Sequence, residues 1–241
     1  MLERFTGQTQ TLLSERACGF ESHPPHQISG LFSIECVATP PDVASCADLR
    51  GRAAAYAYLL GIYLGDGWLT LAHGNVWKLR VALDMRYPGI VDRTEWAIRE
   101  VASRRAGRIR RTGCFEVYSN WKHWHCLFPQ HAPGLKHLRC IELAEWQASI
   151  VAAQPAEFVR GLIHSDGCRT TNRVTRSWAQ TTRSYEYPRY FFSNRSPEIR
   201  GLFIDACAQI GVEASHNNRY SVSVARRASV DVLESVVGPK R

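Results

Sequence analysis

The sequence predicts an α+β fold of two pseudo-symmetric halves, each with the element order αββαββα. Two observations carry this prediction. First, the stretch from Leu59 to Gly67 is matched by the stretch from Val159 to Gly167, so that Gly61 and Gly161 are spaced 100 residues apart. Second, the same succession of helical and alternating strand patterns follows each stretch. Together they indicate two homologous halves in one chain.

Each stretch is typical of the end of an apolar helix, and we call these two helices the motif helices. Small residues recur four positions apart on one face of each, as Gly61 with Gly65 and as Gly161 with Ser165. Small residues at this spacing let two helices approach backbone to backbone. We therefore expect these four residues to form the interface of the two halves, about a pseudo-twofold axis.

Both motif helices end in Asp-Gly, and the aspartates, Asp66 and Asp166, are unusual there. A carboxylate in the last turn faces the negative end of the helix dipole, which costs a few tenths to about 1 kcal/mol. Two such charges on packed helices also repel each other. A divalent metal is the simplest group that would stabilise the pair, although both aspartates could instead be turn formers alone.

Composition favours a nucleic-acid partner. The chain of 241 residues has a formal charge of +8 and an isoelectric point near 9.2, carried mainly by arginine. Its eight cysteines are scattered without a Cys-x-x-Cys pair, and residues 1–20 contain no apolar signal segment. The longest apolar run, Ala53–Gly65, is too short to span a bilayer. We expect reduced thiols, no membrane partner and a cytoplasmic location (nucleoid-associated in a bacterium).

Three segments divide the chain. Residues 1–50 are rich in proline, serine and histidine without a sustained period, which predicts a disordered extension. Within it, Gly19–His23 is what a common tRNA T-arm sequence encodes, so the extension could also reflect a start codon placed too early. Residues 51–153 are expected to form the first half, and residues 154–241 the second.

The element boundaries follow from periodicity and from glycine and proline positions. In the first half we expect helices over Ala53–Leu64, Pro88–Arg105 and Ile141–Ala153, with strands over Trp68–Leu71, Trp77–Asp84, Arg108–Thr112 and Phe115–Trp121. In the second half we expect a motif helix from Pro155, helices over Pro197–Ile210 and Val230–Val237, and strands over Arg169–Arg176, Tyr185–Asn194, Val212–Ser215 and Arg219–Ala225.

A second internal match supports the duplication. The segment Asp84–Ile90 parallels Ser193–Ile199, at a spacing nine residues longer than that of the motifs. We assign the extra length to a longer polar loop near Trp178–Ser184.

Gly61-Ile62-Tyr63-Leu64-Gly65-Asp66-Gly67 and Gly161-Leu162-Ile163-His164-Ser165-Asp166-Gly167 resemble the signature of the LAGLIDADG homing endonucleases. The resemblance covers residues 58–241 and implies a free-standing, single-chain, monomeric member of this mobile-element family. It implies an enzyme that hydrolyses both strands of a long, nearly palindromic DNA site. It also implies that Asp66 and Asp166 are catalytic and hold Mg²⁺ (or Mn²⁺), which would stabilise the attacking and leaving oxygens.

The family also places a basic residue at the end of the fourth strand of each half, near the scissile phosphate. The best positional matches are Lys122 and, in the second half, Arg226 or Arg227. Arginine departs from the usual lysine, which puts equal activity of the two halves in doubt. An exposed charge at the end of a sheet is the alternative.

Basic residues on the expected strands suit a sheet that reads DNA, since arginine can bind guanine and contact phosphates. Lys78 and Arg80 share one face by alternation, as do Arg108 and Arg110. In the second half the corresponding candidates are Arg169, Arg173, Arg189 and Arg195. Each arginine alone could equally belong to a solvated surface, and it is their recurrence that favours DNA.

Three alternatives stay open. One is a non-cleaving LAGLIDADG-like transcription regulator, which Leu64 and His164 favour because the signature has its first aspartate there. Another is an RNA-binding or splicing helper. A third concerns a zinc site in the irregular stretch before the second half, although no standard ligand spacing is present. Its candidate ligands are His123, His125, Cys126, His131, His137 and Cys140.

Overall fold

The structure is a computed structural model that describes residue 49, residues 51–178 and residues 181–238. The expected N-terminal extension therefore lies almost wholly outside the described residues. In the first half the elements are α2 (Ala53–Asp66), β1 (Gly67–Ala72), β2 (Val76–Asp84), α3 (Pro88–Ala102), β3 (Gly107–Arg111), β4 (Cys114–Asn120), α4 (Trp124–Leu127), the 3-10 turn η1 (Lys136–Leu138) and α5 (Glu145–Ala153).

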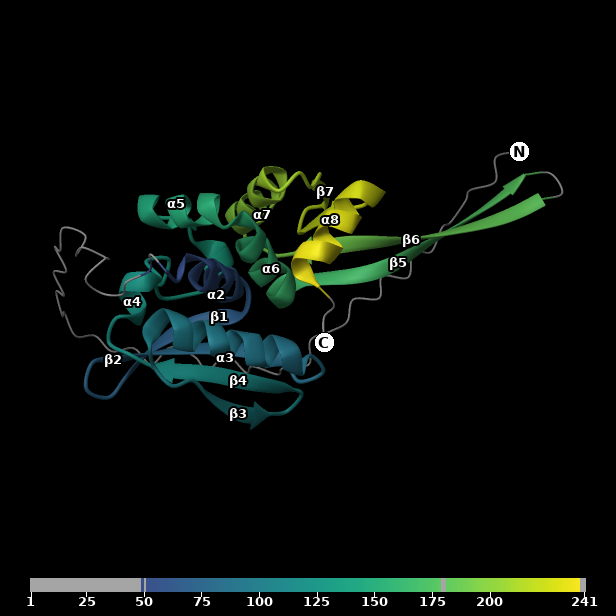
Figure 1. Ribbon diagram of the computed structural model, residues 1–241. Helices are drawn as coiled ribbons and strands as arrows, with labels where there is room; N and C mark the ends of the chain where they lie inside the picture. The colour runs from purple at the N-terminus through teal and green to yellow at the C-terminus, as the bar shows by residue number, and fades with distance from the viewer. Residues whose placement is uncertain (1–48, 50, 179–180, 239–241) are drawn as a thin grey trace. The chain divides into compact units, whose positions relative to one another are not determined.

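The second half repeats this order from its own motif helix onward. Its elements are α6 (Pro155–Asp166), β5 (Gly167–Trp178), β6 (Thr181–Ser193), α7 (Pro197–Gln209), β7 (Ser215–Asn218), β8 (Ser221–Val224) and α8 (Arg227–Val237). Each half contains an antiparallel four-stranded sheet, in the orders β1-β2-β4-β3 and β5-β6-β8-β7. The predicted α+β class and the duplicated αββαββα plan are confirmed (Figure 1).

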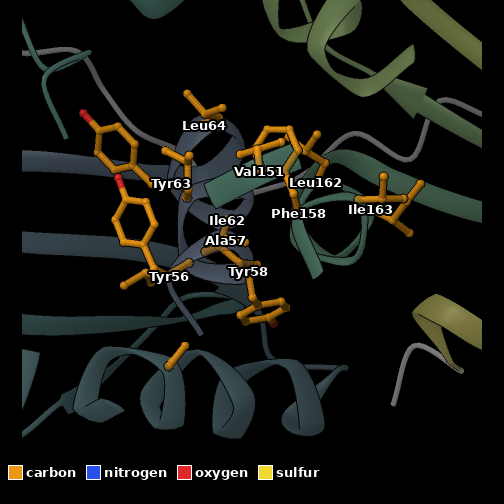
Figure 2. Packing of buried hydrophobic residues seen from close by; sticks show 14 of the residues in the cluster. Tyr56, Ala57, Tyr58, Ile62, Tyr63, Leu64, Val151, Phe158, Leu162 and Ile163 are labelled. Carbon is orange, nitrogen blue, oxygen red and sulfur yellow. The ribbon is translucent and has the colours of Figure 1, made fainter. Parts of the chain in front are cut away.

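The two motif helices, α2 and α6, form the seam between the halves, and Figure 2 shows Phe158 and Leu162 of α6 beside α2. Helix α2 is buried on all sides from Ala55 to Leu64, as its uninterrupted apolar sequence requires. The backbones meet at the glycines, since a Cβ atom on Gly61 would lie 2.6 Å from the Phe158 carbonyl oxygen. The seam is therefore a backbone contact.

A buried polar network joins α2 to α5. The Gln147 amide donates to the Tyr56 hydroxyl at 2.7 Å, and that hydroxyl donates to the Leu127 carbonyl oxygen at 2.6 Å. Burial raises the pKa of Tyr56 far above its usual range. The phenol therefore remains a neutral donor, and the network fixes the chain that connects the two halves.

The hairpin of β5 and β6 corrects the expected polar loop near Trp178–Ser184. The strands pair along twelve positions, from Gly167 with Phe192 to Trp178 with Thr181, so the extra length continues the ladder. By contrast, β1 and β2 pair along six positions. The outer part is a two-stranded ribbon, because β8 pairs with β6 only from Tyr190 to Ser193 (Figure 1).

Smaller differences concern boundaries. Helix α3 ends at Ala102, three residues earlier than expected, with Ser103 in the left-handed region at φ 50°. Gly67 follows α2 in an extended conformation, so it is not a left-handed cap. It is needed because a Cβ atom there would meet the Tyr63 backbone at 2.7 Å. Among the described residues, no helix is both long and apolar enough to cross a membrane.

Candidate metal centre and DNA interface

The two motif aspartates converge at one end of the seam. Asp66 and Asp166 are the last residues of α2 and α6, and each is followed directly by a strand of its own sheet. A Cβ atom built on Gly65 would lie 2.9 Å from Oδ2 of Asp166 and 2.2 Å from Oγ of Ser165. The Asp166 carboxylate thus sits beside the residue that precedes Asp66, which brings the two negative charges together.

The surroundings of the two acids differ. The Asn194 side-chain amide donates to Oδ2 of Asp166 at 2.8 Å, which orients that carboxylate. In the internal match the counterpart of Asn194 is Met85, a residue without an amide donor. The residue two positions before each acid differs too. In α6 it is His164, whose Nδ1 lies 3.1 Å from the Tyr58 hydroxyl of α2, so this histidine bonds across the seam.

Lys136 is the basic residue that the structure places at the acids, and sequence reasoning missed it. It belongs to η1, in the connection between the halves, and its ammonium donates to the carbonyl oxygens of Tyr63, Leu64 (3.1 Å) and Gly65 (3.3 Å). Loss of solvent lowers the pKa of Lys136 to about 8, while the negative charges of Asp166 and Asp66 oppose this shift. Both carboxylates are therefore electrostatic neighbours of the ammonium.

No periodic pattern could have identified Lys136, because its segment is irregular and its partners are main-chain atoms seventy residues earlier. The only sequence signal is indirect. Two helices that end in acids need a compensating positive charge, and any basic residue on the connecting segment is a candidate to supply it.

An open pocket of about 360 Å³ lies beside this group. Its lining includes Lys136, Asp166, Asn194 and Arg195. The remaining lining residues are Leu64, Gly65, His137 and Ser193. Carboxylate and cationic groups in one pocket suit a phosphate that approaches together with a metal ion. Arg195, one of the predicted DNA-binding residues, is thereby placed next to a motif acid.

The donor set fits a hard divalent cation. Two carboxylates, backed by the carbonyl oxygens at the end of α2, are the oxygen ligands that Mg²⁺ prefers, with water and phosphate completing its shell. The Lys136 ammonium acts as a stand-in cation on those carbonyls. Throughout the described residues there is no group of three or more His, Cys, Asp or Glu side chains that could hold a metal. The protein would therefore supply few ligands.

Lys122 and Arg226, the basic residues expected at the scissile phosphate, each follow the last strand of their sheet by two residues. Gly67, which follows Asp66, is level with Val117 across the sheet. The end of β4 at Asn120 is three residues further along, roughly 10 Å, and Lys122 lies beyond it. Arg226 occupies the equivalent place two residues past β8, where it pairs with Glu213.

The histidine-rich stretch is organised by aromatic contacts. The rings of His125 and His131 lie 5.5 Å and 5.1 Å from the Trp77 ring. Cys126 Sγ is 3.9 Å from His123 Nδ1, a weak hydrogen-bonding contact. Together with the result on metal-binding groups in the described residues, this favours packed histidines over the zinc alternative.

The sheets separate the predicted DNA-binding residues by face. In the first sheet, Leu79 and Val81 point toward the buried core, whereas Lys78 and Arg80 occupy the opposite side, which we call the open face. Tyr118 shares it, since Tyr118 pairs with Arg80, and its ring lies 4.2 Å from the Lys78 ammonium.

Arg108 and Arg110 lie on the other face. They pair with Val117 and Phe115 of β4, and Arg108 donates to Glu95 (2.6 Å) and Asp92 of α3. The candidate DNA-binding residues of β2 and β3 therefore lie on opposite faces of the sheet. Alternation shows which residues share a face, but the burial of their neighbours decides which face is open.

The second sheet repeats this separation. Tyr190 and Phe192 point into the core, and Arg169 lies on their side, paired with Glu234 of α8. By alternation Arg173 points to the same side of its strand as Arg169, and it forms an ion pair with Glu186. On the open face, Arg189 donates to the Ser223 hydroxyl at 2.9 Å. Of the eight predicted DNA-binding residues, three therefore lie on the open faces, and Arg195 lies in the pocket.

The faces give a direct prediction for DNA binding. We expect Lys78→Ala to weaken binding to any DNA sequence and to reduce the slope of log affinity against log salt by about 1, because one phosphate contact is lost. Arg110→Ala, which removes a charge from the opposite face of the same sheet, should leave that slope unchanged. Fluorescence anisotropy over a range of salt concentrations measures both. Equal losses would contradict the assignment of the open face.

A charged cluster stiffens the open face of the first sheet. Arg80 donates to both carboxylate oxygens of Glu116, at 2.7 Å and 2.8 Å, and Arg111 donates at 3.4 Å. The Glu116 side chain is only 2% exposed. Burial raises the pKa of Glu116, but the hydrogen bonds and charges of Arg80 and Arg111 outweigh burial and hold that pKa below its usual value.

Glu116→Gln should lower the free energy of unfolding by about 2 kcal/mol at neutral pH, because two arginines lose a buried counter-charge. The pKa of Glu116 is depressed in the folded state, so the wild-type advantage is present above about pH 4.5 and is lost as the pH falls through the folded pKa. Urea unfolding at neutral pH and at about pH 3 measures this. Glu186→Gln, at an exposed pair, should cost under about 0.5 kcal/mol. A pH-independent loss in Glu116→Gln would contradict the electrostatic account.

Comparison with known proteins finds distant structural similarities alone. No protein-family model and no curated protein matches the chain. Among solved structures, the chain is similar to mesophilic variants of the homing endonuclease I-DmoI, with a TM-score of 0.49 and 13% identity over 79% of this chain and 98% of that one. The N-terminal LAGLIDADG domain of WhiA gives 0.48 and 14% over 79% and 85%.

The LAGLIDADG meganuclease I-AabMI bound to uncleaved DNA gives a TM-score of 0.48 and 11% identity over 75% of this chain and 82% of that one. These are distant similarities of fold. They include homing endonucleases and the LAGLIDADG domain of WhiA alike.

Proposed function

We propose that the protein is a site-specific DNA endonuclease that hydrolyses phosphodiester bonds with a divalent metal held by Asp66 and Asp166. The observation that carries this proposal is the convergence of two acids at the end of a backbone-to-backbone helix seam, where each is electrostatically costly. Such a cost is expected at functional sites.

In this proposal each residue of the site has one task. Asp66 and Asp166 would bind Mg²⁺ or Mn²⁺, which stabilises the attacking and leaving oxygens of the phosphodiester when it is bound. Asn194 holds the Asp166 carboxylate in orientation. Arg195, which lines the same pocket, would contact the phosphate, and the open faces of the two sheets would lie on double-stranded DNA.

A randomised double-stranded DNA library tests the proposal. The purified protein is incubated with the library and Mg²⁺, and the cut ends are sequenced. We expect cleavage at one long sequence, which chelation of the metal abolishes. Cleavage that persists in the chelator would exclude the metal-dependent mechanism.

A non-cleaving DNA-binding regulator is the second candidate. Lys136 favours it, because an ammonium beside the two acids already offsets part of the negative charge that a metal would neutralise. Sequence-specific retention of DNA without cutting, in the same library experiment, would support this candidate over the nuclease.

A further inference from the structure

The end of the seam concentrates negative charge. Two helices present their negative dipole ends there, and each adds a carboxylate, Asp66 from α2 and Asp166 from α6. Asn194 binds Asp166 but is neutral, so it orients this charge without cancelling it. A cation at this point would offset that charge even when no metal is present.

Lys136 supplies such a cation from outside both helices. It lies in η1, between the first sheet and α5, and its ammonium reaches carbonyl oxygens of the last turn of α2, at 3.1 Å from Leu64 and 3.3 Å from Gly65. The ring of Tyr63 lies 4.8 Å from the same nitrogen and adds a cation–π contact. The ammonium is held by several partners at once, which distinguishes it from an exposed lysine that happens to be near an acid.

We propose that Lys136 is the internal counter-ion of the two motif acids: it holds the seam together when no divalent metal is bound, and it competes with that metal for the same negative charge. The inference rests on the metal site of the proposed function, but it assigns Lys136 a positioning role and requires no cleavage. If this is so, removing the ammonium should raise the affinity for the metal and lower the stability of the metal-free protein.

Calorimetric titration with Mn²⁺ tests the competition. Lys136→Gln keeps a hydrogen-bond donor for the helix carbonyls and loses the charge, whereas Lys136→Met keeps only the apolar stem. We expect both variants to bind Mn²⁺ at least about tenfold more tightly than the wild type, because a unit charge close to the metal is removed. Arg104→Met, which removes an exposed charge elsewhere, should leave the affinity unchanged. Unchanged affinity in Lys136→Gln overturns the proposal.

Thermal unfolding in a chelator tests the structural role. We expect Lys136→Gln to melt about 5 °C or more below the wild type, and we expect Mn²⁺ or the added substitution Asp166→Asn to recover most of the loss. A loss that neither restores would mean that the ammonium acts through its contacts with the α2 carbonyl oxygens and the Tyr63 ring and not as a counter-charge to the acids, which overturns the counter-ion role. If Lys136→Met does not fold, Lys136→Gln alone decides the question.

The outcome is separable from that of the proposed function. A wild-type protein that cuts no DNA, combined with tighter Mn²⁺ binding in Lys136→Gln, would remove the nuclease and leave the counter-ion role standing. Cleavage by the wild type, with unchanged Mn²⁺ affinity and melting temperature in Lys136→Gln, would support the nuclease and exclude the counter-ion role.

Discussion

Gly161→Ala is expected to lower the free energy of unfolding by about 3 kcal/mol or more, and to leave little folded protein at 37 °C. A Cβ atom at this position would lie 2.2 Å from the Tyr58 carbonyl oxygen and 3.1 Å from the Gly61 Cα atom. These are main-chain atoms of a helix buried on all sides, so they cannot rotate away as a side chain would. The motif helices would have to separate, and overpacking of this kind exceeds the usual range of about 1–3 kcal/mol.

Gly201→Ala is the matched control. Gly201 lies inside α7, and a Cβ atom there would have nothing within 4 Å. Replacing a helical glycine at an open position should stabilise the protein by about 0.5–1 kcal/mol, because the unfolded chain loses conformational freedom. Chemical unfolding of both variants measures the contrast. A Gly161→Ala protein as stable as the wild type would show that the seam is looser than the backbone contact implies.

Asp66→Asn and Asp166→Asn are each expected to reduce Mg²⁺-dependent cleavage by about 10³-fold, because removal of a metal ligand sacrifices several kcal/mol of transition-state stabilisation. Neither should destabilise the fold, since each removes one of two like charges at the negative ends of α2 and α6. Asp231→Asn, at an exposed position of α8, is the control and should cut normally.

The rate of cutting of each DNA strand, followed on a substrate labelled on both, provides the measurement. Because Asn194 orients only Asp166, we expect the two variants to differ in which strand they still nick. Cutting that survives both substitutions would contradict the assignment of the metal ligands, while the fold and the DNA interface would be unaffected.

The seam could be predicted from the sequence because it depends on residue size at fixed spacing. Gly61 and Gly161 are visible as small residues in an apolar run, and helix geometry then dictates that they face a partner. The strands of the first half followed for the same reason, since alternation is a local property, whereas β7 lies at Ser215–Asn218 and not at the expected Val212–Ser215.

The basic residues could not be placed in the same way. Arg108 and Arg80 look alike in sequence, and only the burial of Val117 and the carboxylates of α3 decide that they point to opposite sides of the sheet. Lys136 depends on main-chain atoms far away in the chain, for which no local pattern exists. The charge contacts between distant segments, and the face of the sheet to which each arginine points, could therefore be determined only from the structure.

The two hairpins differ in length, which makes the two halves of the protein unequal. The ribbon of β5 and β6 has twice as many paired positions as that of β1 and β2, although the sheets share one strand order. A two-stranded ribbon can enter the major groove, and each added residue pair advances it by about 3.4 Å, close to one base-pair step. If the sheets lie on DNA as proposed, one arm of the target is longer, and the protein distinguishes the two ends of a duplex that a symmetric dimer would bind either way round.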